Sequence, residues 1–230
     1  MTTILQYRDF ITKMLNVYDN FVNSIDKLKI WYKIYLINVQ GMKGQFFMRI
    51  ISGSARGTNL YTLEGLETRP TLDRVKESLF NIIQEKIYDA KVLDLFSGSG
   101  AIGLEFASRG AKEITLCDNS KKAIEIIQKN INKTHLEEKV KLYNCDYLEL
   151  LKKLKGNKYN IIYLDPPYKT DYIKIAIEKI ITYKLKDEDG IIIAETDEPE
   201  KIKKELKDID IEIIDERKYG RAFLLFAKWF

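Results

Sequence analysis

From residue 89 onwards the sequence alternates between short apolar runs and amphipathic stretches, and this alternation restricts the fold more than any other feature. Helical patterns occupy most of the gaps between the apolar runs, for example residues 120–133 and 171–183. The apolar runs predict strands at 91–96, 113–117, 140–145, 160–164, 190–195, 209–216 and 222–229. Alternation of this kind is typical of a doubly wound, mostly parallel α/β sheet with helices on both faces.

The last two predicted strands break the alternation. Only Lys218-Tyr219-Gly220-Arg221 separates them, and so short a link can connect only antiparallel strands. We therefore expect a seven-stranded sheet that is parallel except for an antiparallel hairpin at its C-terminal end.

Two further segments precede the sheet. Residues 48–88 contain alternating runs at 49–53 and 59–63, which predict a β-hairpin, and Thr68-Arg69-Pro70-Thr71 then opens a helix. In residues 1–47 apolar side chains recur at steps of three and four, which predicts one or two amphipathic helices of unknown role. We expect three parts, namely a helical extension (1–47), a hairpin with its helix (48–88) and the sheet (89–230).

The composition fits a soluble protein with free thiols. Of 230 residues, 45% are hydrophobic and 31% charged, and a net charge of +4 is compatible with binding to nucleic acid without indicating a polybasic tail. The apolar stretch 30–39 is too short to span a bilayer and contains Lys33. Cys117 and Cys145 suit buried free thiols, so we expect a cytoplasmic protein with no membrane association.

The run that ends at Leu164 is followed directly by Asp165-Pro166-Pro167-Tyr168. Ligands of parallel sheets bind beyond the carboxyl ends of the strands, which is where these four residues should lie. The prolines make the turn stiff and leave its carbonyls free to accept hydrogen bonds. Asp165 adds a second acceptor and Tyr168 a flat ring, so the four candidate catalytic residues suit a planar group with an exocyclic amine, such as a nucleobase.

The first strand of the sheet leads into a glycine-rich loop with Gly98, Gly100 and Gly103 in the pattern G-x-G-x-x-G, and Asp118 ends the next strand. Two classes of enzyme use such a loop. In a dinucleotide enzyme it approaches a pyrophosphate, and in an S-adenosylmethionine enzyme it approaches an amino acid and a ribose. The loop alone does not separate them.

Asp94 favours the second class. A carboxylate before the loop can pair with the ammonium group of a ligand but would repel a pyrophosphate. Asp118 suits ribose hydroxyls, and Asp146, which follows the third strand, suits an adenine amino group. The candidate cofactor-binding residues are Asp94, Phe96, Gly98, Gly100, Gly103, Asp118, Asn119, Asp146 and Tyr147.

From Met48 to Phe230 the sequence resembles the RsmD-like 16S rRNA guanine-N2 methyltransferases of bacteria. The most specific match is the stretch from Thr68 to Asn81, and the loop at 94–103, the motif at 165–168 and the ending at 218–221 also match. Two departures stand out. Thr58 and Asn59 occupy positions where the family commonly has basic residues, and residues 1–47 have no counterpart.

The resemblance implies a class I, Rossmann-like methyltransferase that transfers a methyl group from S-adenosylmethionine to the N2 of one guanine in 16S rRNA, within a small-subunit particle. The residue chemistry is compatible with this reaction, because Asp165 and the Pro166 carbonyl could accept the two hydrogens of the amine while Tyr168 stacks on the base. The base must leave any helical stack to reach the pocket. We expect the enzyme to be a monomer.

Four arginines are candidates for contacts to the RNA backbone, Arg49 and Arg56 on the hairpin and Arg69 and Arg74 near the pocket. His135 is expected to be exposed without a role, and with a single histidine no metal site is expected. Three other functions fit parts of the pattern: an adenine-N6 DNA methyltransferase, which also uses D-P-P-Y, an NAD-dependent oxidoreductase and an RNA-binding assembly factor.

Overall fold

The computed structural model describes residues 48–63, 70–168 and 170–228, and for residues 70–74 it describes the backbone alone. The chain divides into two compact units, Met1–Gln45 and Phe46–Phe230. The helices expected in residues 1–47 lie outside the described residues. All features below belong to the second unit.

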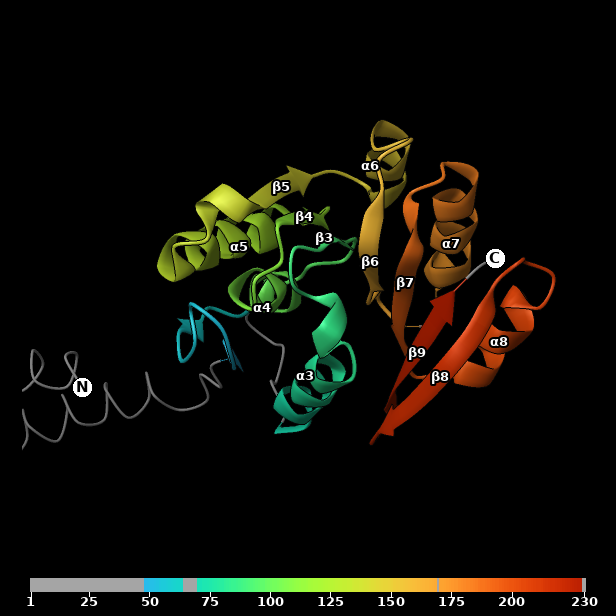
Figure 1. Ribbon diagram of the computed structural model, residues 1–230, viewed down its shortest axis with the longest axis horizontal. Helices are drawn as coiled ribbons and strands as arrows, with labels where there is room; N and C mark the ends of the chain where they lie inside the picture. The colour runs from blue at the N-terminus through green and yellow to red at the C-terminus, as the bar shows by residue number, and fades with distance from the viewer. Residues whose placement is uncertain (1–47, 64–69, 169, 229–230) are drawn as a thin grey trace, which may run out of the picture. The chain divides into compact units, whose positions relative to one another are not determined.

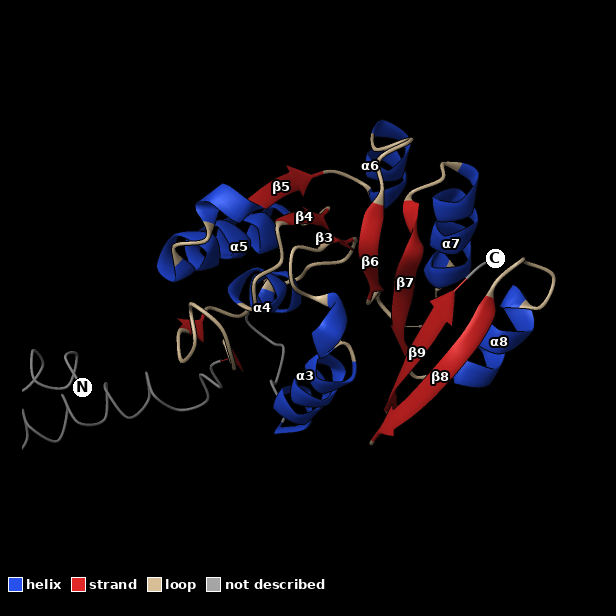
Figure 2. Ribbon diagram, in the orientation of Figure 1, coloured by secondary structure: helices blue, strands red, loops and turns tan. Residues whose placement is uncertain are grey.

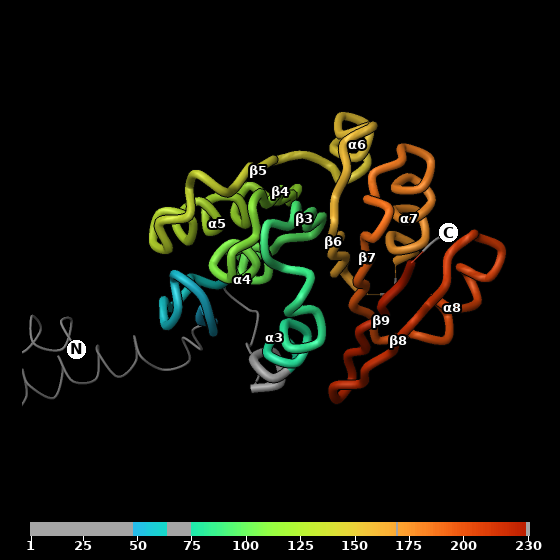
Figure 3. Tube along the Cα trace, in the orientation of Figure 1, coloured from blue at the N-terminus to red at the C-terminus, as the bar shows by residue number. Residues whose placement is uncertain are grey.

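Seven strands form one sheet in the order β5-β4-β3-β6-β7-β9-β8. The strands pair in parallel except β9, which runs antiparallel to β7 and β8 on either side. The trace in Figure 3 shows the C-terminal strand lying between its two neighbours. This arrangement confirms the predicted mixed sheet with a C-terminal hairpin. The strands are β3 (Lys91–Asp94), β4 (Glu113–Asp118), β5 (Val140–Asn144), β6 (Tyr159–Leu164), β7 (Lys186–Thr196), β8 (Glu212–Tyr219) and β9 (Ala222–Lys228).

Helices cover both faces of the sheet (Figures 1 and 2). Helices α3 (Pro70–Ile82), α4 (Ala101–Ser108) and α5 (Lys121–Thr134) share one core cluster, whereas α6 (Tyr147–Lys153), α7 (Tyr172–Thr182) and α8 (Pro199–Leu206) share the other. Two short 3₁₀ turns, Gln84–Lys86 and Glu137–Lys139, lie between elements. Strand β6 contributes to both cores because successive side chains point to opposite faces, with Tyr163 on the first and Leu164 on the second.

Most observed boundaries lie within a few residues of those predicted, and local hydrogen bonds accompany the boundaries of β3 and α5. Strand β3 ends at Asp94 rather than Phe96 because the chain turns there, and the Ser97 hydroxyl donates to the Asp94 carbonyl at 3.0 Å. Helix α5 begins after Ser120, whose hydroxyl accepts the Ala123 N–H at 3.4 Å. Strand β7 begins at Lys186, four residues before the predicted start at Gly190, and β8 begins at Glu212.

The N-terminal hairpin is shorter than the sequence predicts. Its ladder consists only of β1 (Met48–Arg49) and β2 (Asn59–Leu60), not of the expected runs 49–53 and 59–63. The backbone after Ile50 leaves the ladder because its N–H groups bind side chains of α4 instead. Helix α4 therefore supports the hairpin.

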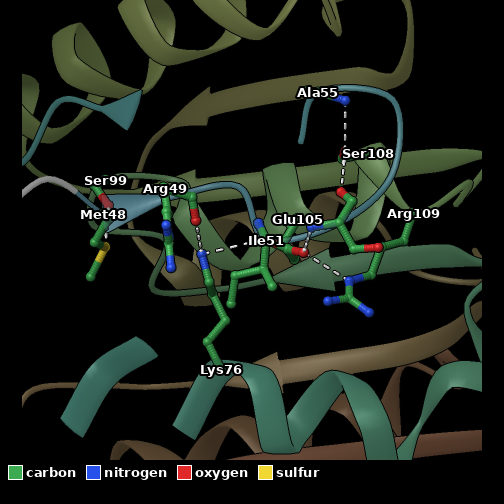
Figure 4. A network of polar contacts seen from close by, with 10 residues as sticks. Met48, Arg49, Ile51, Ala55, Lys76, Ser99, Glu105, Ser108 and Arg109 are labelled. Atoms are coloured by element: carbon green, nitrogen blue, oxygen red, sulfur yellow. Dashed lines mark hydrogen bonds and ion pairs between the residues drawn. The ribbon is translucent and has the colours of Figure 1, made fainter. Parts of the chain in front are cut away.

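A hairpin seat made by Lys76, Glu105, Ser108 and Arg109 holds this backbone (Figure 4). Glu105 is fully buried and accepts the N–H groups of Ile51 at 2.8 Å and Ser52 at 2.9 Å. The same carboxylate forms ion pairs with Lys76 at 3.3 Å and with Arg109 at 2.8 Å. Lys76 also donates to the carbonyl of Arg49.

Ser108 fixes the tip of the hairpin from the same helix. Its hydroxyl accepts the Ala55 N–H at 2.9 Å and donates to the Ser52 carbonyl at 2.6 Å. Only glycine fits at position 53, because a Cβ there would lie 1.8 Å from the Ser108 carbonyl oxygen. The hairpin and α4 are therefore packed backbone against backbone.

Asn130 of α5 connects the exit of the hairpin to the glycine-rich loop. Its side chain accepts the Tyr61 N–H at 2.7 Å and donates both to the Tyr61 carbonyl at 3.0 Å and to the Ser99 carbonyl at 2.8 Å. One buried amide therefore fixes the hairpin and the loop to each other.

Helix α3 reaches the far end of the sheet. Ser78 on α3 forms a hydrogen bond with the hydroxyl of Tyr219 at the end of β8. These residues come from two of the segments on which the sequence resemblance depends, 68–81 and 218–221, and they are 141 positions apart in the chain.

Candidate active site

A cavity of about 560 Å³ opens at the carboxyl ends of β3, β4, β6 and β7. The strand order reverses between β3 and β6, and this topological switch point is where open α/β sheets bind their ligands. The volume lies in the range of small-molecule sites. Among the predicted site residues, those that line the cavity are Asp94, Phe96, Gly98, Asp118, Asn119, Asp146, Tyr147 and all four of 165–168.

The glycine-rich loop is held by the strand beside it. The Asp118 carboxylate accepts the Gly98 N–H at 2.9 Å and the Ser120 N–H at 2.8 Å. Gly100 precedes α4 and donates its N–H to the Ser97 carbonyl at 2.7 Å. A Cβ at Gly103 would lie 2.2 Å from Leu116 Cδ2, so glycine permits the close packing of α4 on β4. Gly100 and Gly103 thus shape the loop from outside the cavity lining.

Asp94 is the buried acceptor at the bottom of this loop. Its side chain is 1% exposed, and its Oδ1 atom has no hydrogen-bond partner among the described residues. Burial raises the pKa of this carboxyl to about 7, with a smaller contribution from the charge of Asp118, although hydrogen bonds from Phe96 and Ser97 oppose the shift. A buried acceptor without a donor suits a ligand that brings a cation.

Aromatic rings form one wall of the cavity. The ring of Tyr147 lies 5.0 Å from that of Phe96 and 5.2 Å from that of Tyr172, and Phe96 and Tyr172 are stacked at 6.1 Å. The sequence analysis did not identify Tyr172. Asp146 caps α6 by accepting the Leu148 N–H at 2.8 Å, which leaves its second oxygen available to a ligand.

The segment 165–168 also lines the cavity. Burial raises the pKa of the Asp165 carboxyl well above its usual range, and the charges of Glu195 and Asp94 add to the shift. Pro166 is buried, whereas Tyr168 is 52% exposed and presents its ring at the mouth. The carbonyl of Pro167 is not free as expected, because it accepts the Thr170 hydroxyl at 2.9 Å. This hydrogen bond stiffens the turn further.

Two polar residues of the cavity were missed by the sequence analysis. Tyr163 donates its hydroxyl proton to Glu195 Oε2 at 2.8 Å, and both side chains are buried. Glu195 ends an apolar run in the same way as Asp94 and Asp118 do, so the same pattern could have identified it. Tyr163 lies inside an apolar run, and nothing in the sequence distinguishes it from a core residue.

The predicted RNA-contacting arginines lie away from the cavity lining where they are described. Arg49 and Arg56 are exposed on the hairpin. Arg69 lies outside the described residues, and so does the side chain of Arg74. The hairpin region nevertheless reaches the cavity through Met48, and Ser99 in the loop donates a hydrogen bond to the sulfur of Met48 at 3.6 Å.

The cysteines and the histidine have no metal-binding arrangement among the described residues. Cys117 is a buried free thiol, as expected, whereas Cys145 is a free thiol that is only half-buried because it lines the cavity. His135 is exposed at the C-terminal end of α5. Within 48–63, 70–168 and 170–228 no three His, Cys, Asp or Glu side chains are grouped closely enough to hold a metal ion. No helix in these ranges has the length and apolar character needed to cross a bilayer.

Residues 48–228 match the profile of a protein family described as Conserved hypothetical protein 95. The chain belongs to this family. It is the RsmD-like methyltransferase family that the motifs at 68–81, 94–103 and 165–168 predict.

Named relatives of this RsmD-like protein include rRNA methyltransferases. It is 39% identical over 152 residues to YlbH of Bacillus subtilis, named as a candidate rRNA methyltransferase, and the match covers 65% of this chain and 83% of YlbH. It is 32% identical over 163 residues to the ribosomal RNA small subunit methyltransferase D of Haemophilus influenzae, with 70% and 83% covered.

Solved structures agree with this assignment. YhhF of Escherichia coli, named as a candidate methyltransferase, superposes with a TM-score of 0.68 at 29% identity, covering 80% of this chain and 98% of YhhF. The RsmD-like protein therefore has the class I, Rossmann-like methyltransferase fold, and as a member of this methyltransferase family it uses S-adenosylmethionine as its cofactor. The buried, unpartnered Oδ1 of Asp94 fits the ammonium group of that cofactor, and the aromatic wall fits its adenine.

Proposed function

We propose that this protein transfers a methyl group to the exocyclic N2 of one guanine in 16S rRNA. The observation that carries the proposal is the placement of Asp165, Pro166 and the exposed Tyr168 ring on the wall of the cavity that also contains Asp94. The small ribosomal subunit is proposed as the source of the RNA substrate because the Haemophilus influenzae relative is named as a small subunit rRNA methyltransferase. The choice of guanine N2 follows from the resemblance of residues 68–81 to the RsmD-like family.

The part of the cavity lined by Asp94, Asp118 and Asp146 binds and orients the cofactor. S-adenosylmethionine supplies a methyl group bonded to a positively charged sulfur. Asp94 pairs with the ammonium group of the cofactor, Asp118 accepts from ribose hydroxyls with its remaining lone pairs, and Asp146 accepts from the adenine amino group. Phe96 and Tyr147 supply the apolar surface against which a flat ring packs.

The other half of the cavity prepares the nucleophile. The lone pair of an aryl amine is delocalised into its ring, so the amine attacks well only when its nitrogen is held pyramidal and aimed at the methyl group. Asp165 and the Pro166 carbonyl accept the two N–H groups and hold that geometry. Tyr168 stacks on the base and fixes its plane.

The substrate must present an extruded base. The aromatic and acidic groups lie inside a cavity, so a stacked guanine has to leave its helix to reach Asp165. Arg49 and Arg56 on the exposed hairpin contact phosphates near that base, and Arg69 and Arg74 are proposed to do the same. We expect a monomeric, cytoplasmic enzyme that acts on a small-subunit particle.

The test is to map the methyl group. Small subunits from cells that lack the gene are incubated with the protein and labelled S-adenosylmethionine, and the labelled nucleoside is identified by mass. N2-methylguanosine at one position is expected. Label on adenine N6 would replace the proposal with the adenine-N6 alternative, and thermal stabilisation by NAD but not by S-adenosylmethionine would favour an oxidoreductase.

A substitution tests the role of Asp165. Asp165→Ala should lower methyl transfer by about 100- to 1,000-fold, because one acceptor for the reacting amine is lost, while cofactor binding measured by calorimetry is retained. Asp189→Asn, at the exposed start of β7, removes the same charge far from the cavity and should leave the rate unchanged. Near wild-type turnover by Asp165→Ala would exclude the proposed role.

A further inference from the structure

Three neighbouring strands bring four acidic or phenolic side chains together on one face of the sheet. In the parallel ladders Asp94 is paired with Tyr163, and Leu164 is paired with Ala194. Asp165 and Glu195 follow that last pair on adjacent strands, so they lie at the same level. Asp94, Tyr163, Asp165 and Glu195 all line the cavity.

Glu195 is oriented by a single strong contact. Its side chain is 6% exposed, and the Tyr163 hydroxyl donates to Oε2 at 2.8 Å. Among the described residues no lysine or arginine forms an ion pair with Glu195 or Asp165. Within the described residues, the two carboxyl groups thus line one cavity and influence each other without an ion-pair partner.

Two such carboxyl groups cannot both ionise at low cost, so they titrate as a pair. Burial raises the pKa of Glu195, and the hydrogen bond from the Tyr163 hydroxyl opposes this shift by favouring the ionised form. Burial and the charge of Glu195 raise the pKa of Asp165 well above its usual range. Other titratable groups near the pair in the described structure are Asp94, Tyr168 and Asp197, and the residue of β9 opposite Glu195 is Leu224.

We propose that Glu195, held in place by Tyr163, is a positioning residue that makes Asp165 the proton acceptor for the reacting amine. The inference rests on the proposed function and adds the route of the proton. As the amine nitrogen forms its bond to the methyl carbon, the carbon–sulfur bond breaks with its electron pair remaining on sulfur, and the positive charge passes to nitrogen. One N–H proton then moves to the Asp165 carboxylate and from there to water.

This role explains why an acid that has no ion-pair partner among the described residues lies beside Asp165. A carboxylate of ordinary pKa is a weak base at neutral pH, and proton transfer is most effective when the pKa of the acceptor is near the working pH. The anionic neighbour supplies that shift without touching the substrate. Glu195 therefore acts through Asp165 and is not itself a catalytic residue.

The decisive experiment titrates Asp165 directly. The full-length protein is labelled with ¹³C at the side-chain carboxyl of aspartate, and its resonances are followed against pH without RNA, the Asp165 signal being identified by its loss in Asp165→Ala. In Glu195→Gln, which keeps an acceptor for Tyr163 but no charge, the Asp165 midpoint should fall by about one pH unit or more. An unchanged midpoint in a folded Glu195→Gln protein would overturn the proposal.

The pH dependence of turnover gives the second measurement. Because Asp165 must be ionised to accept a proton, kcat falls on the acid side of its pKa, and Glu195→Gln should move this limb to lower pH by the same shift. At pH values above both midpoints its kcat should be severalfold below wild type, because Asp165 has become a weaker base, with the KM for S-adenosylmethionine unchanged. An equal loss at every pH would indicate a merely structural residue and also overturn the proposal.

Two further variants keep the outcome clear. Glu198→Gln removes an exposed carboxylate three residues beyond Glu195 and should shift neither measurement. Tyr163→Phe weakens the ionisation of Glu195 and should shift Asp165 in the same direction by a smaller amount, which decides the matter if Glu195→Gln does not fold. If the wild-type protein does not methylate guanine, the proposed function is wrong. The titration still shows, independently of that result, whether Glu195 raises the pKa of Asp165.

Discussion

Two buried carboxylates of this protein have contrasting surroundings, Glu105 in the hairpin seat and Asp94 in the cavity. Glu105 is surrounded by two backbone N–H groups and two cationic side chains. Asp94 is buried to the same degree, yet one of its oxygens has no donor among the described residues. The first carboxylate completes its interactions on folding, whereas the second completes them only with a ligand.

The comparison shows how burial alone fails to distinguish structure from function. A buried charge that is fully paired stabilises one arrangement of the backbone, and its removal leaves its partners unpaired. A buried acceptor that lacks a donor destabilises the free protein and strengthens the binding of a cation. Four substitutions or conditions test this difference.

Loss of the fully paired carboxylate should have the largest effect. Glu105→Ala leaves Lys76 and Arg109 without their shared partner and frees two N–H groups of the hairpin. We expect the free energy of unfolding to fall by about 3–5 kcal/mol in urea titrations. Glu113→Gln breaks only the half-exposed pair with Lys141 and should change the urea midpoint little. Equal effects of the two variants would show that the hairpin seat contributes nothing special.

Loss of the unpaired carboxylate should weaken binding and not folding. Asp94→Asn removes the partner of the cofactor ammonium group, so the affinity for S-adenosylmethionine measured by calorimetry should fall by about 10- to 100-fold, or roughly 1.5–3 kcal/mol. The urea midpoint of the free protein at pH 8 should rise at the same time. A decrease in both quantities would place Asp94 with Glu105 as a structural residue.

Ser108 tests the hairpin seat at one hydroxyl. Ser108→Ala removes the acceptor of the Ala55 N–H and the donor to the Ser52 carbonyl. A loss of about 2 kcal/mol in the free energy of unfolding is expected, since each hydrogen bond contributes about 1 kcal/mol. Ser54→Ala, at an exposed serine of the same turn, is the matched control. If both variants unfold at the wild-type midpoint, the hydroxyl is not required.

The smallest effect concerns pH. The pKa of Asp94 in the free protein is raised to about 7 from an ordinary value near 4, so the folded state binds a proton that the unfolded state has lost. The stability contributed by this group is therefore present below about pH 4 and lost as the pH rises through 7.

The same proton opposes cofactor binding, because an ammonium group pairs only with the ionised form. The affinity for S-adenosylmethionine should rise by about five- to tenfold between pH 6 and pH 7.5, and calorimetry in buffers of different ionisation enthalpy should detect a released proton. In Asp94→Asn this pH dependence should disappear. Persistence of the full effect in that variant would assign the proton to another group.

The sequence predicted those cavity-lining residues that lie in short continuous motifs. The loop at 94–103 and the motif at 165–168 each follow a strand, and parallel strands bring their carboxyl ends to one edge, so local patterns were sufficient. Tyr163 and Tyr172 could not be assigned in this way, because their place in the cavity depends on neighbours from distant segments. The hydrogen bond between Tyr163 and Glu195 joins two strands whose segments are far apart in the sequence.

The hairpin was predicted less accurately for a related reason. Alternation in residues 49–53 and 59–63 favours two strands of equal length, but the backbone of Ile51 and Ser52 binds Glu105, which the sequence places more than fifty positions away. Hydrogen bonds to the distant Glu105 side chain thus replaced hydrogen bonds between the two strands of the hairpin. The sequence of the hairpin itself does not indicate this replacement.

The position of β9 has a consequence for how the protein is made. The last strand of the chain is inserted between β7 and β8, and Tyr219 just before it binds Ser78. During synthesis on the ribosome, one edge of β7 therefore remains unpaired until residues 222–228 emerge, and such edges are prone to pair with other chains. A nascent chain stopped shortly before Ala222 would contain every motif of the site and yet depend on chaperones to stay soluble.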